Sequence, residues 1–302
     1  MADESELEVL ARERDRLAGL LEREHSHLSE AQALLAVFQR SRAVKLATAL
    51  RRLQARVPRL RRESPAAVGA ASLRAPSESE VEYFVKRDWI DNEHVRLLLS
   101  FALPTDANCL DVGAHEGLWL KEFLRVAPAG RHVAYEPIPE LAQRLKRRFP
   151  SIDVRELALS NSEGESSFVY LPDLPAYSGL RERTYPDPVQ RKVSLTIRTE
   201  CLDDHWPAER SLDLVIIDVE GAEALVLEGA LKTLVRYRPI VVFEHGVGAA
   251  DHYGTQPRDV WTLLHDGAGL RVFDLDGNGP YSLSEFEAEF AAARRWNYVA
   301  HA

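Results

Sequence analysis

Acidic residues that follow an apolar run at 214–217 are the first candidates for chemistry in this chain. The sequence reads LVIIDVEGAEALVLEGA, with Asp218, Glu220 and Glu223 between the apolar run and a helix-like pattern. A carboxylate at the end of a buried strand needs a polar partner or a ligand, so Asp218 is a candidate active-site residue. Carboxylates in the first turn of a helix are stabilised by its partial positive charge. Glu220 therefore has two interpretations, a substrate contact or a helix cap, whereas the cap interpretation is favoured for Glu223.

A second apolar run, PIVVF, ends in Glu244 and His245. Ligands of open α/β sheets bind at the carboxyl ends of strands, where these side chains would lie beside Asp218. We expect one of the three residues to act as a general base, and the ordinary pKa of an imidazole suits His245 to this role. A divalent metal held by them is an alternative that we do not favour, because magnesium prefers oxygen ligands to histidine. No metal ligand is assigned.

The segment NCLDVGAHEGLWLKEFL has the pattern of a buried strand, a glycine turn and a helix. Glycines such as Gly113 and Gly117 allow a ligand to approach the backbone, and the helix start offers free N–H groups. The spacing is not the G-x-G-x-x-G pattern of dinucleotide sites. Asp111 and Glu116 would repel a diphosphate, so the loop favours a ligand with a positive charge, such as the amino and sulfonium groups of S-adenosylmethionine.

Glu136 follows the next strand-like run, at the edge where an adenosine ribose is bound in related folds. A carboxylate at this position can accept hydrogen bonds from the ribose hydroxyls. The alternative is a surface residue that caps the following helix. Together with the glycine loop, Glu136 predicts an adenosyl cofactor, and the missing third glycine favours S-adenosylmethionine over NAD.

Strand-like and helix-like patterns alternate along the chain and would position these residues. The strand-like runs are 107–112, 131–135, 152–159, 212–219, 239–244, 270–275 and 296–300, and the helix-like runs are 116–126, 138–149, 222–236, 257–266 and 283–294. This alternation predicts an α/β fold with a doubly wound, mainly parallel sheet. Residues 163–199 break the rhythm and predict a hairpin around a polar loop, as in a lid or substrate element. There Tyr177 and Ser178 are candidate substrate contacts, since tyrosine can stack on a sugar face.

The N-terminal part of the chain has a different composition. Residues 1–62 predict a helix with a heptad pattern, either a coiled coil that forms a homodimer or a single helix on its own catalytic domain. Residues 40–62 are rich in Lys and Arg and lack acids, which is typical of a peripheral membrane contact or a solvated helix face. Residues 63–80 predict a linker. This leaves 81–302 as the catalytic domain.

Overall composition limits the classes of partner. The chain has a net charge of −9 although its first 62 residues are basic, so the remainder is strongly acidic and unsuited to nucleic acid. No apolar run is long enough for a transmembrane helix, and the acidic start lacks the apolar segment of a signal peptide. We therefore expect a cytoplasmic protein, with any membrane contact peripheral at the inner membrane.

Several segments resemble the FkbM family of S-adenosylmethionine-dependent methyltransferases. These are LDVGAHEG, YEPIPE, ELALSNSEGESSF, TECLDDHW, LVIIDVEGAEALVLEGALKTLVRYRPIVVFEHG and the terminal WNYVAHA, over roughly residues 90–300. The resemblance implies a class I methyltransferase fold, which is Rossmann-like with a seven-stranded sheet of order 3-2-1-4-5-7-6. It also implies methyl transfer, usually to a hydroxyl oxygen of a sugar or secondary metabolite.

The resemblance also implies which residues contact the cofactor. They lie in the loop after the first strand, at the end of the second strand and after the third: Asp111, Gly113, Ala114, Gly117, Glu136, Ala158 and Leu159. Asp218 would face the transferred methyl group. We therefore expect an O-methyltransferase that acts on a sugar, a glycan or a small natural product. The alternatives are a non-catalytic coiled-coil scaffold with a degenerate cofactor fold and an NAD-dependent oxidoreductase.

Overall fold

The computed structural model describes residues 78–183 and 191–302. The chain divides into two units, 1–75 and 76–302, and only the second contains described residues. The predicted coiled coil, the basic segment 40–62 and most of the predicted linker lie outside the described residues, so they stay predictions.

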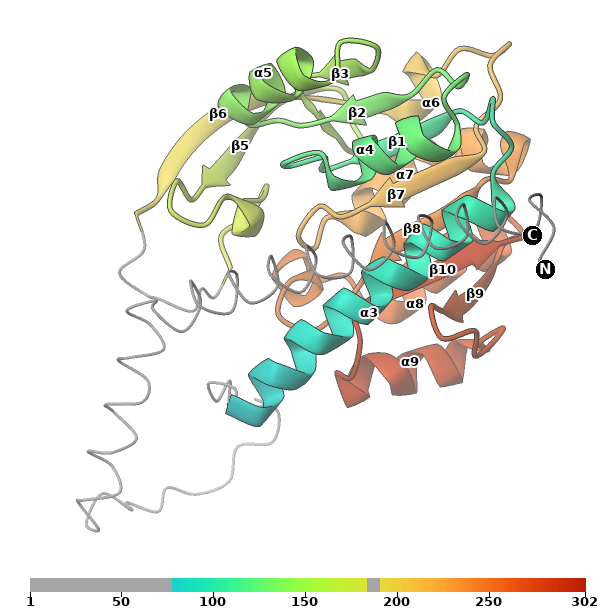
Figure 1. Ribbon diagram of the computed structural model, residues 1–302. Coiled ribbons are helices and arrows are strands. Elements are labelled where there is room, and N and C mark those ends of the chain that lie inside the picture. The colour runs from blue at the N-terminus through green and yellow to red at the C-terminus, as the bar shows by residue number, and fades with distance from the viewer. Residues whose placement is uncertain (1–77, 184–190) are drawn as a thin grey trace, which may run out of the picture. The chain divides into compact units, whose positions relative to one another are not determined.

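Seven strands form one sheet in the order β3-β2-β1-β7-β8-β10-β9 (Figure 1). Only β10 runs antiparallel to its neighbours, so the order and direction match the predicted 3-2-1-4-5-7-6 sheet and confirm the fold class. The central strands β1 and β7 are short and buried on both faces, and they are apolar except for Asp111 of β1, as parallel sheets require. Their bounds are β1 Cys109–Val112, β2 Val133–Tyr135, β3 Asp153–Arg155, β7 Leu214–Ile217, β8 Ile240–Glu244, β9 Arg271–Asp274 and β10 Asn297–His301.

Helices cover both faces of this sheet. Helices α3, α4 and α5 contribute Leu99, Phe123 and Leu145 to the core on one face. Helices α7 and α9 contribute Leu227 and Phe286 to the core on the other face. The helices are α3 Glu78–Ala102, α4 Leu118–Val126, α5 Pro139–Arg148, α6 Leu202–His205, α7 Glu223–Tyr237, α8 Pro257–Thr262 and α9 Leu283–Ala292.

A second, three-stranded sheet holds the predicted hairpin. Strands β5 Gly164–Tyr170 and β6 Val193–Glu200 pair antiparallel, which confirms the hairpin, and β4 Ala158–Leu159 pairs with β6. The predicted strand 152–159 is therefore wrong as one element, because its two halves join different sheets. Phe168 and Ile197 of the hairpin pack on Ile138 and Leu141 at the start of α5.

Helix α3 is the long element that the sequence patterns missed. It buries Val95 and Leu99, while Trp89, Leu97 and Phe101 are exposed. Apolar residues on both faces remove the periodic signal that marks an amphipathic helix. Neither α3 nor any other helix in the described part of the chain is both long and apolar enough to cross a membrane.

Candidate active site

The loop between β1 and α4 is held tightly against the ends of β2 and β7. The N–H groups of Gly113 and Ala114 donate to the carbonyl oxygen of Tyr135 at 2.9 and 3.0 Å. A Cβ atom on Gly113 would lie 1.9 Å from the carbonyl oxygen of Asp218, and the φ of Gly113 is +89°. Glycine is thus required here, because any side chain would separate the loop from β7.

Glu136 supports the same loop from the end of β2. Its Oε2 atom accepts a hydrogen bond from the His115 N–H, and its Oε1 atom accepts one from the Ile138 N–H, both at 2.8 Å. Burial raises the pKa of Glu136 to about 7, although the two N–H donors act to lower it. Each carboxylate oxygen can accept more than one hydrogen bond, so Glu136 keeps acceptor capacity for a ligand.

A cavity of about 120 Å³ lies at the carboxyl ends of β1, β2 and β7. Its apolar wall includes Ile138, Leu159 and Phe168, and its polar wall includes Glu136 and Asp218. Of the residues predicted from the sequence, the cavity brings together Gly113, Glu136, Ala158, Leu159, Asp218, Glu220 and Ser178.

Other predicted cofactor residues lie behind the cavity. Asp111 is buried, its Oδ2 atom has no hydrogen-bond partner, and burial raises its pKa well above the usual range. Ala114 is buried in the core beside α3 and α4. Gly117 precedes α4 with a φ of +78°, and a Cβ atom there would lie 2.6 Å from the ring of Phe149. These residues shape the loop and do not line the cavity.

Three carboxylates meet at the ends of β7 and β8. Oxygen atoms of Asp218, Glu220 and Glu244 lie within 4.8 Å of one another. Desolvation, followed by the charges of Asp218 and Glu220, raises the pKa of Glu244 well above its usual range. The raised pKa favours the neutral form of Glu244, which relieves the repulsion between the clustered carboxylates. The structure thus places Asp218 and Glu244 together, as the sequence predicted.

The hairpin loop supplies a positive charge to this cluster. Arg183 forms an ion pair with Glu220 at 2.6 Å and lies over the ring of Tyr177, 4.7 Å from its centroid. Desolvation and then Asp218 raise the pKa of Glu220, and Arg183 opposes this shift. Nearby, the Oγ atom of Ser178 accepts the Leu171 N–H at 3.0 Å. The predicted substrate residues Tyr177 and Ser178 therefore belong to a loop attached to the acidic cluster.

Glu223 lies in the first turn of α7, as the sequence predicted, but its side chain bonds the preceding turn and does not cap the helix. Its Oε1 atom accepts the N–H groups of Gly221 at 3.0 Å and Val219 at 3.3 Å. Burial raises the pKa of this carboxyl to about 7. Glu223 therefore stabilises the turn before α7, and it is 1% exposed, so it does not reach the solvent.

His245 does not join the acidic cluster. Its ring is 1% exposed and packs against Phe286 and Phe290 of α9, with centroids 6.0 and 4.9 Å away. Neither ring nitrogen has a hydrogen-bond partner among the described residues, and burial lowers the pKa of His245 to about 4. Successive residues of a strand point to opposite faces, so His245 points away when Glu244 points to the cluster. This placement does not suit the predicted general base.

Two polar residues near the cluster were missed because they belong to α3. Asp88 and Asn92 line a smaller cavity of about 50 Å³ that Asp218 and Glu244 also line. The dense polar run DWIDNEH, which contains both residues, was the sequence feature that could have drawn attention to them. It indicated that α3 carries polar residues but not that they face the sheet.

Comparisons with known proteins agree with this arrangement. The sequence model of the methyltransferase FkbM domain matches residues 111–271. AMB antimetabolite synthetase AmbE of Pseudomonas aeruginosa is 32% identical over an alignment of 205 positions that covers 55% of this chain and 10% of that protein. 2-O-methyltransferase NoeI of Sinorhizobium fredii is 27% identical over 168 residues, 47% of this chain and 65% of that protein.

A third relative and a solved structure are similar in the same way. Methyltransferase sdnD of Sordaria araneosa is 26% identical over 159 residues, 42% of this chain and 61% of that protein. The crystal structure of methyltransferase FkbM from Methylobacillus flagellatus has 14% identity and a TM-score of 0.43, over 68% of this chain and 48% of that one. This chain therefore spans less than two thirds of the length of each curated relative.

The matched segment begins at Asp111 and includes the glycine loop, Glu136 and the acidic cluster. It covers more than half of the chain. Because this match coincides with the sheet order of a class I methyltransferase, the chain belongs to the FkbM methyltransferase family, whose fold is that of S-adenosylmethionine-dependent enzymes.

Proposed function

We propose that this protein transfers a methyl group from S-adenosylmethionine to a hydroxyl oxygen of a sugar, a glycan or a small natural product. The observation that carries the proposal is one cavity with Glu136 on one side and the Asp218 cluster on the other. The names of two relatives, a 2-O-methyltransferase and a methyltransferase, support the same class of reaction.

The groups around the cavity fit S-adenosylmethionine. Glu136 has acceptor capacity for ribose hydroxyls, and the apolar wall of Ile138, Leu159 and Phe168 suits a flat base. An acidic pocket without a lysine or arginine in its wall does not suit a diphosphate, which argues against NAD.

Asp218 is the residue that we assign to the acceptor. S-adenosylmethionine supplies an activated methyl group when bound, so the protein must align the hydroxyl and accept its proton. Asp218 is exposed at the end of β7, where a hydroxyl can reach it. Its carboxylate lies beside those of Glu220 and Glu244, with oxygen atoms within 4.8 Å of one another. A general base of this kind contributes about 10²–10⁴-fold to the rate.

We do not assign a metal to the three carboxylates. Arg183 balances the charge of Glu220, and the raised pKa of Glu244 favours its neutral form. The cluster therefore has a low net charge without a cation, although three oxygen ligands are the type that magnesium prefers.

The experiment combines cofactor binding with methyl transfer. Isothermal titration measures binding of S-adenosylhomocysteine, and radiolabelled S-adenosylmethionine reports transfer to methyl glycosides of hexoses, deoxyhexoses and N-acetylhexosamines. We expect binding and transfer to at least one glycoside. Absence of binding would favour the non-catalytic scaffold, and stabilisation by NADH in place of S-adenosylhomocysteine would favour the oxidoreductase. Binding without transfer to any glycoside would contradict the sugar hydroxyl as acceptor.

A further inference from the structure

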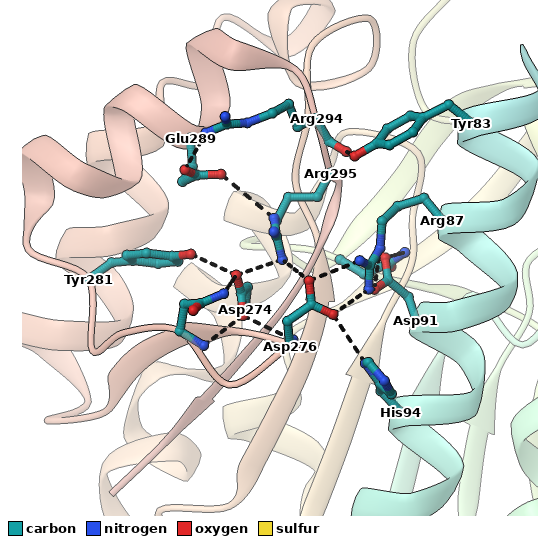
Figure 2. Close-up of polar contacts among 12 residues, drawn as sticks. Tyr83, Arg87, Asp91, His94, Asp274, Asp276, Tyr281, Glu289, Arg294 and Arg295 are labelled. Carbon is teal, nitrogen blue, oxygen red and sulfur yellow. Dashed lines mark hydrogen bonds and ion pairs between the residues drawn. The ribbon is translucent and has the colours of Figure 1, made fainter. Parts of the chain in front are cut away.

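A network of charged side chains fastens α3 to the C-terminal part of the chain (Figure 2). Arg87 of α3 donates one hydrogen bond to each carboxylate oxygen of Asp276, both at 2.9 Å. Arg295 pairs with the same carboxylate at 3.3 Å. The side chain of Arg87 is only 11% exposed. Two parallel hydrogen bonds from one guanidinium fix direction as well as distance, so this contact sets the rotation of α3 about its axis.

The turn after β9 holds Asp276 ready for this contact. The Oδ1 atom of buried Asp274 accepts the N–H groups of Asp276 and Asn278 at 2.9 and 2.8 Å. Its Oδ2 atom accepts the hydroxyl of Tyr281 at 2.8 Å and pairs with Arg295 at 2.6 Å. These bonds order the turn independently of α3, so the turn is a fixed support and α3 is the element that it positions.

The same part of α3 faces the acidic cluster. Asn92 donates from its Nδ2 atom to Asp88 at 3.2 Å, and both residues line the small cavity with Trp119. Desolvation, followed by the charges of Asp218 and Asp91, raises the pKa of Asp88 to about 6, although part of the residue stays exposed. Asp88 is therefore close enough to Asp218 for their charges to interact.

The small cavity and the cofactor cavity meet at Asp218, which lines both. An acceptor hydroxyl must reach the end of β7 from a side that the cofactor does not fill, and the space between α3 and the sheet provides it. Its volume of about 50 Å³ exceeds the ~10–15 Å³ that one water needs. Carboxylates, amides and an indole line it, and these groups bind hydroxyls and stack on sugar rings.

We propose that α3 forms the acceptor side of the active site, where Asp88 and Asn92 bind the hydroxyl-bearing group beside Asp218 and the Arg87–Asp276 contact positions them. This inference rests on the proposed methyl transfer to a hydroxyl. It places acceptor recognition on a helix that precedes the segment matched by the family model. Asp88 and Asn92 are then binding residues, whereas Arg87 and Asp276 are positioning residues that act through them.

The test uses the full-length protein and the methyl glycoside that the wild type methylates fastest. Asp88→Asn should raise the KM for that glycoside by roughly 10–100-fold, as expected when a hydrogen bond to a charged group is lost. The affinity for S-adenosylhomocysteine and the Tm should stay unchanged, since Asp88 does not line the cofactor cavity. Asp106→Asn is the matched control, because Asp106 is an exposed residue in a turn away from both cavities.

Asp276→Asn tests the positioning role. It should raise the same KM in the wild-type background and raise it less in the Asp88→Asn background, because the contact made by Asp88 is already lost there and only that of Asn92 remains to be displaced. A merely structural role would lower the Tm and leave the KM unchanged. Asp266→Asn, which removes an exposed carboxylate from the short π-helix Leu263–Gly267, is the control.

The outcomes separate this inference from the proposed function. A raised KM in both variants, without additivity, supports the acceptor role of α3. Methylation by the wild type with an unchanged KM in Asp88→Asn overturns the role of α3 and leaves the proposed function intact. Normal S-adenosylhomocysteine binding without transfer to any glycoside overturns the proposed acceptor, and this inference with it.

Discussion

Replacing Glu136 with glutamine would test the cofactor site at the residue that joins the loop to β2. In the wild type, both carboxylate oxygens accept backbone N–H groups, one from His115 and one from Ile138. A glutamine amide has one oxygen and one NH₂ group. In either orientation, the NH₂ group faces a backbone N–H, so one of these donors loses its acceptor and one acceptor site for the ribose is lost.

The size of the effect follows from the loss of hydrogen bonds to a charged group. Such bonds contribute about 1.5–3 kcal/mol each, so the loss of one ribose contact weakens binding of S-adenosylhomocysteine by roughly 10–100-fold. Stability should change less than affinity. Burial already penalises the charged carboxylate, as its raised pKa of about 7 indicates, and glutamine removes this penalty.

Isothermal titration of both proteins with S-adenosylhomocysteine at pH 8 measures the change. Glu156→Gln is the matched control, since Glu156 is exposed and pairs with Lys146 at 3.6 Å. We expect wild-type affinity for the control and a large loss for Glu136→Gln with a nearly unchanged Tm. Equal affinity in all three proteins would refute a ribose contact at Glu136. The role of Glu136 would then be limited to supporting the loop.

Four further predictions concern the same site. Affinity for S-adenosylhomocysteine should fall by up to about tenfold per pH unit below pH 7 and level off above it. The reason is that ribose hydroxyls donate to the deprotonated form of Glu136, whose pKa is about 7. Titrations from pH 5 to 9 measure this change in affinity. Asp218→Asn should lower kcat by about 10²–10⁴-fold and keep cofactor affinity, whereas unchanged turnover would exclude Asp218 as the base. His245→Phe should keep turnover and Tm, because it preserves the packing on Phe286 and Phe290 and removes two unpartnered nitrogens; a large loss of kcat would restore the histidine as a catalytic group. Dialysis against EDTA should leave turnover unchanged, and a loss that magnesium restores would show that the carboxylates hold a metal.

The strands and the glycine loop were predictable because local sequence determines them. The runs that became β7 and β8 are continuous apolar stretches, which only a strand or helix buried on both faces can accommodate, and their lengths favour strands. Gly113 marks a position without room for a side chain. These features do not depend on distant contacts, so the sequence alone located the end of β7 and Asp218.

The parts that could not be predicted depend on pairing between distant segments. Ala158 and Leu159 look like the end of β3, but they pair with Thr199 and Glu200 in another sheet. Helix α3 has no apolar stripe of its own, and its position depends on a contact between Arg87 and Asp276. Neither partner could be identified from local sequence, so the pairing of β4 with β6 and the place of α3 were missed.

Glu244 and His245 are adjacent at the end of β8, so strand geometry limits which of them can contact Asp218. Adjacent residues at a strand end point to opposite faces, so only one of them could reach Asp218. The choice depends on the register between β7 and β8. Ile217 pairs with Phe243, and both side chains belong to the core beneath α7 and α9. The next residues, Asp218 and Glu244, therefore share the opposite face with α3, and His245 returns to the side of α9. The alternation of side chains along a strand shows that only one of the two residues can face Asp218. The register between β7 and β8 identifies that residue as Glu244 and excludes His245.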